Sequence, residues 1–194
     1  MPDARPSLIL ASRSPRRRSL LREAGYAFEV IPPSENAEDG AQDGESPIEL
    51  VERLARQKAA DVAARVAAGL VLGCDTVAEC AGQILGKPAD RDDARRMLEL
   101  LRGREHHVYT GLCLWRRPED RILSEVATTT LRMDEVDDAL LAEYLDGGGW
   151  QGKAGAFGLQ DRLGWIHILQ GSESNVVGLP LELLAEMLCE LADR

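Results

Sequence analysis

The sequence has few of the residues that build disulfide frameworks and zinc sites. Its four cysteines, at positions 74, 80, 113 and 189, include no Cys-x-x-Cys pair. Cys74 and Cys80 fall on one predicted strand, too far apart along it to form a bridge. None of the three histidines has the spacing of a zinc ligand set. We therefore expect reduced thiols and no structural zinc.

Long apolar runs are also missing. No segment reaches the roughly 20 residues that a transmembrane helix needs, and residues 1–5 lack the apolar core of a secretion signal. Basic residues are outnumbered, with 23 Lys and Arg against 33 Asp and Glu, so the net charge is −10. An acidic surface repels the phosphates of DNA and RNA. We expect a cytoplasmic protein that binds neither a membrane nor nucleic acid.

The apolar content of 44% over 194 residues supports an ordinary packed core. Periodicity and turn residues predict strands at 8–11, 27–31, 69–79, 106–115, 122–133 and 166–169. They predict helices at 15–24, 47–68, 91–102, 134–145 and 180–191, with a turn at 171–180. The alternation favours a partly parallel sheet with helices on its faces. We expect a single domain over residues 1–194, made of two closely packed lobes.

Polar residues gather where the first predicted strand, 8–11, meets the first predicted helix. Ser14 stands at the helix N-cap, with Ser12, Arg16 and Arg17 beside it. Free backbone N–H groups, the positive end of the helix dipole and two guanidinium groups favour an anion there, most naturally a polyphosphate. The alternative is a solvated basic turn, which is disfavoured because cations at a helix N-terminus oppose the dipole.

The second predicted helix, 47–68, begins with a capping box at Ser46. Its apolar stripe starts at Ile48, and Lys58 falls inside that stripe. A lysine in this place either extends to the rim of the protein or points into a cleft and holds a phosphate. The periodicity does not decide between the two.

An acidic segment, 34–46, precedes this helix. One interpretation is a mobile solvated loop. The other is that one carboxylate, such as that of Glu38, reaches a cation near the phosphate site.

The third predicted strand, 69–79, contains a continuous apolar run followed by Asp75 and Thr76. A carboxylate at the end of a central strand is a common general base or magnesium ligand; a turn or edge aspartate is the alternative.

Lys87 lies in Gly-Lys-Pro, which lacks the Walker pattern. The following proline favours an extended backbone, which presents Lys87 from a loop beside the Asp75 strand. The glycines around Lys153 allow a close approach to a ligand.

These residues combine several cations with one or two carboxylates. Cations neutralise a polyphosphate, and a carboxylate holds a divalent metal and activates water. The combination favours metal-assisted hydrolysis within a phosphate chain. No Ser/His or Cys/His pairing is evident, which argues against a covalent nucleophile.

Seven short motifs occur in one order along nearly the whole chain: LASRSPRR at 10–17, ARQKA at 55–59, CDT at 74–76, GKP at 86–88, YTG at 109–111, GKAGAFGLQ at 152–160 and NVVGLP at 175–180. In these motifs the chain resembles the Maf family of nucleotide pyrophosphatases, once described as septum-formation inhibitors. The resemblance implies an α/β fold of the inosine-triphosphatase-like (Maf/Ham1) type, a two-lobed mixed sheet with flanking helices and a cleft between the lobes. It implies hydrolysis of a nucleoside triphosphate to the monophosphate and pyrophosphate with Mg²⁺ or Mn²⁺, and it makes a homodimer plausible.

The resemblance also implies roles for individual residues. Asp75 is expected to accept a proton from water or to hold the metal with Glu38. The residues expected to act in catalysis beside it are Lys58 and Lys87. The residues expected to bind the substrate are Ser12, Ser14, Arg16, Arg17, Thr76, Lys153 and Gln160.

Three of these positions, Arg16, Thr76 and Gln160, match those that the family links to substrate choice. Gln160 in Gly-Leu-Gln resembles the branch that acts on dTTP and UTP, and an amide can both donate to and accept from a pyrimidine. The alternatives are a pyrophosphatase for methylated nucleotides such as 7-methyl-GTP and a non-catalytic regulator of septum formation.

Overall fold

The computed structural model describes residues 7–161 and 164–192, and these residues form one seven-stranded sheet. The strands are β1 (Leu8–Ala11), β2 (Phe28–Val30), β3 (Gly69–Cys80), β4 (Gln83–Leu85), β5 (Glu105–Arg117), β6 (Arg121–Met133) and β7 (Ile166–Gln170). Their order is β2-β1-β3-β5-β6-β7, with β4 paired to β3 off this path. β1 is parallel to β2 and to β3, and the other pairs are antiparallel. The prediction of a partly parallel sheet is confirmed.

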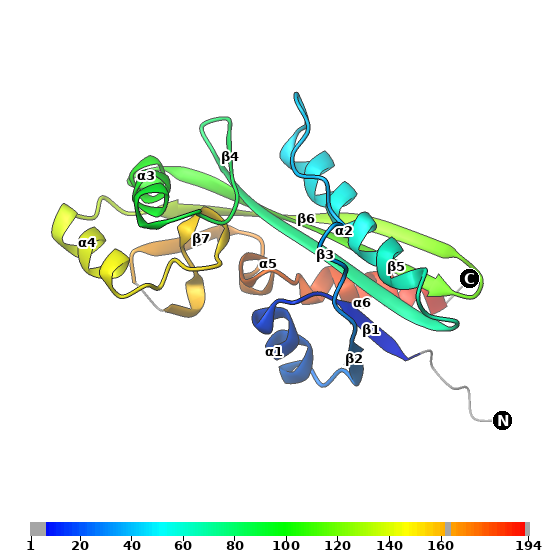
Figure 1. The fold of residues 1–194 in the computed structure, drawn as a ribbon. Helices are drawn as coiled ribbons and strands as arrows, with labels where there is room; N and C mark the ends of the chain where they lie inside the picture. Colours follow the sequence, from blue (N-terminus) through cyan, green and yellow to red (C-terminus); the bar gives the residue numbers. More distant parts are fainter. Residues whose placement is uncertain (1–6, 162–163, 193–194) are drawn as a thin grey trace.

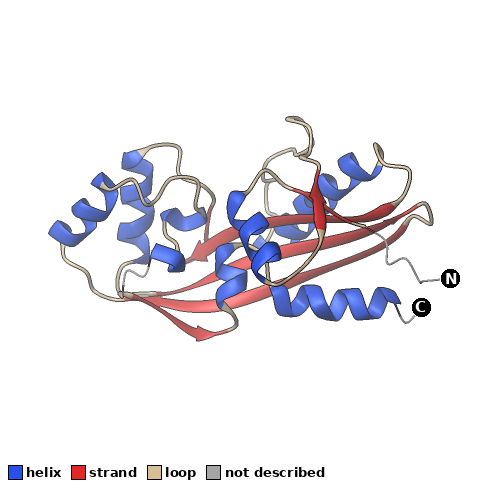
Figure 2. Ribbon diagram, turned by 90° about the horizontal axis from the view of Figure 1, so that it is seen from below, coloured by secondary structure: helices blue, strands red, loops and turns tan. Residues whose placement is uncertain are grey.

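The helices are α1 (Pro15–Glu23), α2 (Pro47–Ala63), α3 (Arg91–Leu101), α4 (Asp138–Asp146), α5 (Glu173–Val177) and α6 (Leu181–Ala192), with two 3₁₀ turns, η1 (Ala154–Ala156) and η2 (Leu159–Asp161). Figure 1 shows α2 on one side of the sheet and α1 on the other. α6 runs along the direction of the long strands (Figure 2). None of the described helices is both long and apolar enough to cross a membrane.

The first lobe consists of β1, β2, α1, α2 and α6 around one half of the sheet. β1 alternates between the two faces, because successive side chains of a strand point in opposite directions. Leu8 and Leu10 pack in the cluster that contains Leu21 of α1 and Leu184 of α6. On the other face, Ile9 and Ala11 pack in a cluster with alanines of α2. The short run after residue 7 is therefore buried on both sides.

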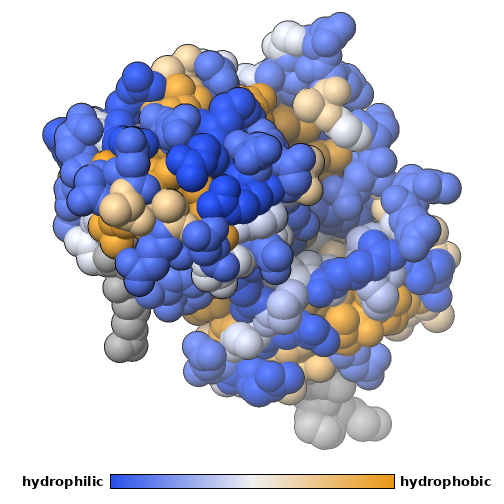
Figure 3. Space-filling model, turned by 60° about the vertical axis from the view of Figure 1, so that its left-hand side comes forward, coloured by the Kyte–Doolittle hydropathy of each residue, from blue (hydrophilic) through white to orange (hydrophobic). Residues whose placement is uncertain are grey.

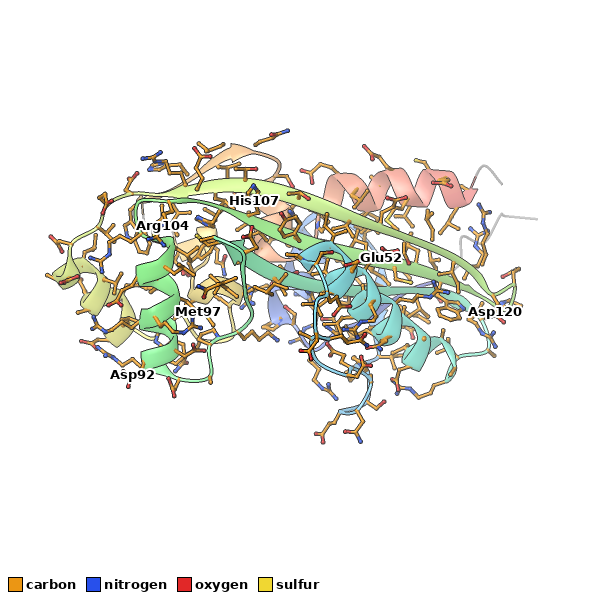
Figure 4. The ribbon with its side chains drawn as sticks, turned by 90° about the horizontal axis from the view of Figure 1, so that it is seen from above. Glu52, Asp92, Met97, Arg104, His107 and Asp120 are labelled. Atoms are coloured by element: carbon orange, nitrogen blue, oxygen red, sulfur yellow. The ribbon has the colours of Figure 1, made fainter. Side chains whose placement is uncertain are left out.

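The second lobe is built on the far ends of β3, β5 and β6, with α3, α4, η1 and β7 around a separate cluster. Met97 and Leu98 of α3, Leu141 of α4 and Phe157 after η1 are buried in it. In Figure 4, Glu52 marks α2 and Met97 marks α3, and the two helices lie over opposite halves of the sheet. The continuous long strands connect the lobes.

Two glycines let α2 lie unusually close to the sheet. A Cβ on Gly73 of β3 would collide with the carbonyl oxygen of Ala55 and would stand 2.9 Å from the Cβ of Ala59. A Cβ on Gly111 of β5 would collide with the carbonyl oxygen of Val51. This close packing brings Lys58 of α2 down to the middle of β3.

Four sequence expectations were wrong in detail. Asp75 lies in the middle of β3 and not at the end of the strand, because β3 continues past it to pair with β4 and β5. α2 ends at Ala63 rather than near residue 68, because the chain must reverse there to enter β3 beside β1. Ile48 does not join the buried stripe and is 47% exposed, since it lies in the first turn of the helix, away from the core. The segment 171–180 is not only a turn: it holds α5, capped by Ser172 and ended by Gly178 in the left-handed region with φ +114°.

Candidate active site

A cleft of about 420 Å³ opens between the two lobes. The surface is hollowed between two masses of side chains, and the residues around the hollow are mostly hydrophilic (Figure 3). All of the site residues predicted from the sequence line it: Ser12, Ser14, Arg16, Arg17, Glu38, Lys58, Asp75, Thr76, Lys87, Lys153 and Gln160. The fold therefore brings together six separate segments of the chain, 12–17, 38, 58, 75–76, 87 and 153–160.

The charge of the cleft is opposite to that of the chain. Among the described residues, six cations line it: Arg13, Arg16, Arg17, Lys58, Lys87 and Lys153. Two carboxylates from the same part of the chain line it, those of Glu38 and Asp75. A protein with a net charge of −10 thus concentrates positive charge in one hollow, which suits a polyanion.

The entrance to α1 has the geometry expected of an anion-binding turn. The Ser14 hydroxyl accepts a hydrogen bond from the Arg17 amide at 3.4 Å and caps the helix. The Ser12 hydroxyl accepts one from the Ser14 amide at 3.2 Å. Both side chains order the turn at the positive end of the helix.

Arg17 is buried, and its guanidinium hydrogen bonds to the protein. It donates to the carbonyl oxygens of Gly178 at 2.7 Å and Cys74 at 3.0 Å, and to the hydroxyls of Ser12 at 3.2 Å and Thr76 at 3.0 Å. These partners come from the end of β1, from β3 and from the turn between α5 and α6. Arg17 therefore joins three segments and fixes a cation in the wall of the cleft.

Thr76 continues this network into the sheet. Its hydroxyl lies 2.9 Å from that of Thr110 on β5, and the Thr110 hydroxyl donates to the carbonyl oxygen of Asn175 at 3.2 Å. Since Thr110 uses its proton there, the Thr76 hydroxyl accepts from Arg17 and donates to Thr110. A directed row of hydrogen bonds holds Thr76 in one orientation.

Lys58 points into the cleft rather than out to the rim. Its Nζ lies 2.5 Å from Asp75 Oδ1 and 2.9 Å from Glu38 Oε2, and it donates to the carbonyl oxygen of Cys74 at 3.3 Å. The lysine side chain is 10% exposed, so little water competes for it. One ammonium group thus brings two carboxylates together, one from β3 and one from the acidic segment.

These two carboxylates fit a hard divalent cation. Mg²⁺ is commonly held by one or two carboxylates, with water and substrate phosphates completing its shell. Glu38 and Asp75 supply only oxygen ligands, and each keeps a second oxygen besides the one that faces Lys58. Within residues 7–161 and 164–192, no group of three or more His, Cys, Asp or Glu is arranged to hold a metal by itself. A metal here would depend on the substrate for the rest of its ligands.

Burial and neighbouring cations perturb two of the basic groups. Burial, followed by the charges of Arg17 and Lys58, lowers the pKa of Lys87 below its usual 10.5. Burial and the charge of Arg17 likewise lower the pKa of Arg16. Positive charges held close together and partly desolvated gain most from an anion.

The opposite wall of the cleft belongs to the second lobe. Arg16 reaches across and donates to the carbonyl oxygen of Gly152 at 2.7 Å. Lys153 forms an ion pair with Asp161, and its side chain is 11% exposed. The Tyr144 hydroxyl donates to Asp161 at 3.1 Å. Gln160, the residue that we expected to read the base, precedes Asp161 in η2 and lies exposed on this wall of the cleft.

Sequence reasoning assigned no role to several of these residues. Asp161 was not expected to pair with Lys153, because a charged residue in a glycine-rich loop carries no signal of its partner. The carbonyl of Gly178 was also missed as the acceptor of Arg17. The sequence feature that could have indicated this acceptor was the motif at 175–180, because a plain turn does not explain that motif.

Known proteins resemble this chain over nearly its whole length. The pattern that defines the family described as "Maf-like protein" matches residues 7–191. A dTTP/UTP pyrophosphatase of Rhodopirellula baltica is 55% identical over 183 residues, which are 94% of this chain and 81% of that one. A nucleoside triphosphate pyrophosphatase of Streptomyces coelicolor is 41% identical over 191 residues, 98% of this chain and 93% of the other.

The fold has a counterpart among solved structures. A HAM1 protein from Coxiella burnetii aligns with a TM-score of 0.52 at 17% identity, over 95% of this chain and 98% of that one. This confirms the expected fold of a two-lobed mixed sheet with flanking helices. Together with the family pattern over residues 7–191 and the identity to the two bacterial pyrophosphatases, it shows that this chain belongs to the Maf family.

Proposed function

We propose that this protein is a nucleoside triphosphate pyrophosphatase that hydrolyses dTTP and UTP to the monophosphate and pyrophosphate. The observation that carries the proposal is the cleft itself, where Lys58 pairs with Asp75 and Glu38 and five further cations of the described residues line the walls. Its choice of nucleotide is supported by the relatives, since the one from Rhodopirellula baltica at 55% identity is named a dTTP/UTP pyrophosphatase.

The residues of the cleft have different chemical roles in this reaction. Arg16, Lys87 and Lys58 neutralise the triphosphate, while the N-terminus of α1 and the ordered Ser12–Ser14 turn offer hydrogen bonds to phosphate oxygens. Water attacks the α-phosphorus, the bond from that atom to the oxygen bridging to the β-phosphorus breaks, and pyrophosphate leaves. A carboxylate within this cluster accepts the proton of the water, and Asp75 is the better placed because it is 14% exposed against 36% for Glu38.

A Mg²⁺ or Mn²⁺ ion held by Asp75 and Glu38 would supply positive charge to the breaking bond and orient the phosphates. The ammonium group of Lys58 pairs with both carboxylates and offsets part of their negative charge. Gln160 stands on the wall of the cleft contributed by the second lobe, and its amide offers both a donor and an acceptor to a pyrimidine.

Pyrophosphate release from a nucleotide panel tests the proposal. The panel contains dTTP, UTP, CTP, GTP, 7-methyl-GTP and 5-methyl-UTP, each with Mg²⁺ and with Mn²⁺. We expect preference for dTTP and UTP, and the Asp75→Asn variant should bind nucleotide but lose at least about 10²-fold in turnover. Preference for a methylated base would overturn the assignment of the base. No release from any nucleotide would favour the non-catalytic regulator instead.

The expected single domain over residues 1–194, the cytoplasmic location, the absence of nucleic-acid binding and the possible homodimer stay predictions. Gel filtration with light scattering at several protein concentrations measures the oligomeric state.

A further inference from the structure

The acidic segment before α2 is fastened to the helix at three points. Asp61, Gln57 and Arg53 stand four residues apart on α2, so they lie along one face. The Ser34 amide donates to Asp61 Oδ2 at 3.0 Å, and Gln57 Nε2 donates to Asp39 Oδ1 at 2.7 Å. Arg53 holds the remainder of the segment, which is thus an ordered strap along the helix rather than a mobile solvated loop.

Arg53 makes the largest share of these contacts. Its Nε donates to Glu45 Oε1 at 2.6 Å and its Nη2 to Glu45 Oε2 at 2.7 Å, which is a two-pronged pair. The same Nη2 donates to the carbonyl oxygen of Gly40 at 2.8 Å, and Nη1 pairs with Asp39. The Glu45 side chain is 9% exposed and that of Asp39 is 61% exposed. We call these contacts of Arg53 with Asp39, Gly40 and Glu45 the clasp. Its contact with Glu45 is therefore the stronger one, and its contact with the exposed Asp39 is the weaker.

Glu38 lies between two of these fastened points. Its neighbour Asp39 is held by Gln57 and Arg53, and Ser34 is held by Asp61. Glu38 itself turns to Lys58, one residue after Gln57, with Nζ at 2.9 Å from Oε2. The backbone on both sides of Glu38 is thus set by α2, the helix that also carries Lys58.

We propose that Arg53 is a positioning residue that orders the strap and so sets the affinity of the Glu38–Asp75 pair for a divalent metal ion. The inference rests on the proposed function, because it takes that pair as the metal site. Without the clasp, the strap would have to be ordered when the metal binds, and that conformational entropy would be subtracted from the affinity. Arginine suits this role, since its planar fork matches the carboxylate of Glu45 and still reaches Gly40.

The test measures Mn²⁺ binding by electron paramagnetic resonance, with Mn²⁺ alone and with a UTP analogue whose α–β bridge is a methylene group. We expect Arg53→Gln to weaken Mn²⁺ binding about tenfold or more, as loss of an outer-shell partner does at other metal sites. The matched control is Arg56→Gln. Arg56 is exposed on the same helix, and no hydrogen bond or ion pair among the described residues ties it to the strap. The Arg56→Gln variant should leave the Mn²⁺ affinity unchanged.

A double-variant cycle separates positioning from general damage. If Arg53 acts through Glu38, Arg53→Gln should have no further effect on Mn²⁺ affinity in a Glu38→Gln protein. Equal losses in both backgrounds, or unchanged affinity in Arg53→Gln, would overturn the proposal. Should Arg53→Gln fail to fold, Arg53→Lys keeps the charge and loses the two-pronged geometry, so an affinity equal to that of the wild type would overturn it equally. A wild-type protein that hydrolyses no nucleotide contradicts the proposed function, while the binding cycle still decides the role of Arg53.

Discussion

Arg17 Nε donates a 2.7 Å hydrogen bond to the carbonyl oxygen of Gly178, a residue 161 positions further along the chain. Through the same guanidinium, the end of β1, the middle of β3 and the turn after α5 are joined beside the cleft. The two arginines of the basic turn thus have different roles. Arg16 points into the cleft and across it, whereas the hydrogen-bond donors of Arg17 are largely used by acceptors within the protein. Its positive charge still reaches the site, because it lowers the pKa of both Arg16 and Lys87.

Replacing Arg17 by lysine should therefore affect stability as well as binding. A lysine keeps the charge but cannot reach four acceptors from a planar group, and buried carbonyls would lose their donors. We expect the free energy of unfolding to fall by about 2–4 kcal/mol, measured by urea denaturation. The exposed Arg18, changed to lysine, is the matched control and should be neutral. Equal stability of both variants would show that the network does not hold the three segments together.

Gly73 supports a prediction about the helix that carries Lys58. A Cβ at this position collides with the carbonyl oxygen of Ala55, so Gly73→Ala must move α2 away from the sheet. We expect the free energy of unfolding to fall by about 1–3 kcal/mol and the reaction rate to fall with it. Gly86→Ala is the control for stability, since a Cβ there meets nothing within 4 Å and the residue has no positive φ. A Gly73→Ala protein with unchanged melting temperature and activity would contradict the close packing.

Much of the fold follows from short-range patterns in the sequence. The capping box at Ser46 marks the start of α2, and the alternation in β6 marks a strand, because both signals are local. The end of α2 is not local: it depends on where β3 must begin beside β1, and the periodic pattern continues beyond it. α5 was also missed, since a helix of five residues is stabilised by its caps and by the contacts of buried Asn175 with β5 and β6 rather than by periodicity.

The candidate site shows the same division between what local signals predict and what depends on distant parts of the chain. The sequence motifs name the residues that line the cleft, but they do not name what holds those residues in place. The partners of Lys58 lie 20 residues before it and 17 after it, and Arg53 meets Glu45 across the start of its own helix. Such pairs depend on how the chain folds back on itself, and a single sequence has no local signal for that.

The lowered pKa of Lys87 predicts that nucleotide binding is coupled to proton uptake. In the free protein, burial and nearby cations make this ammonium lose its proton below 10.5. A bound triphosphate brings negative charge, which favours the protonated form and raises the pKa again. Binding should therefore take up protons at alkaline pH, and KM should rise as the pH passes the lowered pKa. Calorimetry of a non-hydrolysable UTP analogue in two buffers of different ionisation enthalpy measures the uptake, and Lys87→Gln should abolish it. The same uptake in that variant would assign it to another group.

His106 predicts how stability changes with acid. It is fully buried behind Phe157, at a ring separation of 5.2 Å, and its Nε2 has no hydrogen-bond partner among the described residues. Burial lowers its pKa to about 4 from the usual 6.5. As the pH falls from 6.5, the unfolded chain takes up a proton here and the folded protein does not until about 4, so the stabilisation present above 6.5 is lost within this window.

The loss from this one group is at most about 3 kcal/mol. Urea denaturation at a series of pH values measures it, with His106→Gln as the comparison. The variant starts from a lower stability because its side chain packs differently against Phe157, so the quantity to compare is the slope of the unfolding free energy against pH. Between the two pKa values the slope should be shallower in His106→Gln by about one proton, since glutamine does not titrate. Parallel curves for the two proteins would mean that His106 already takes up its proton in the folded state, and that its ring is less buried than its contacts with Phe157 imply.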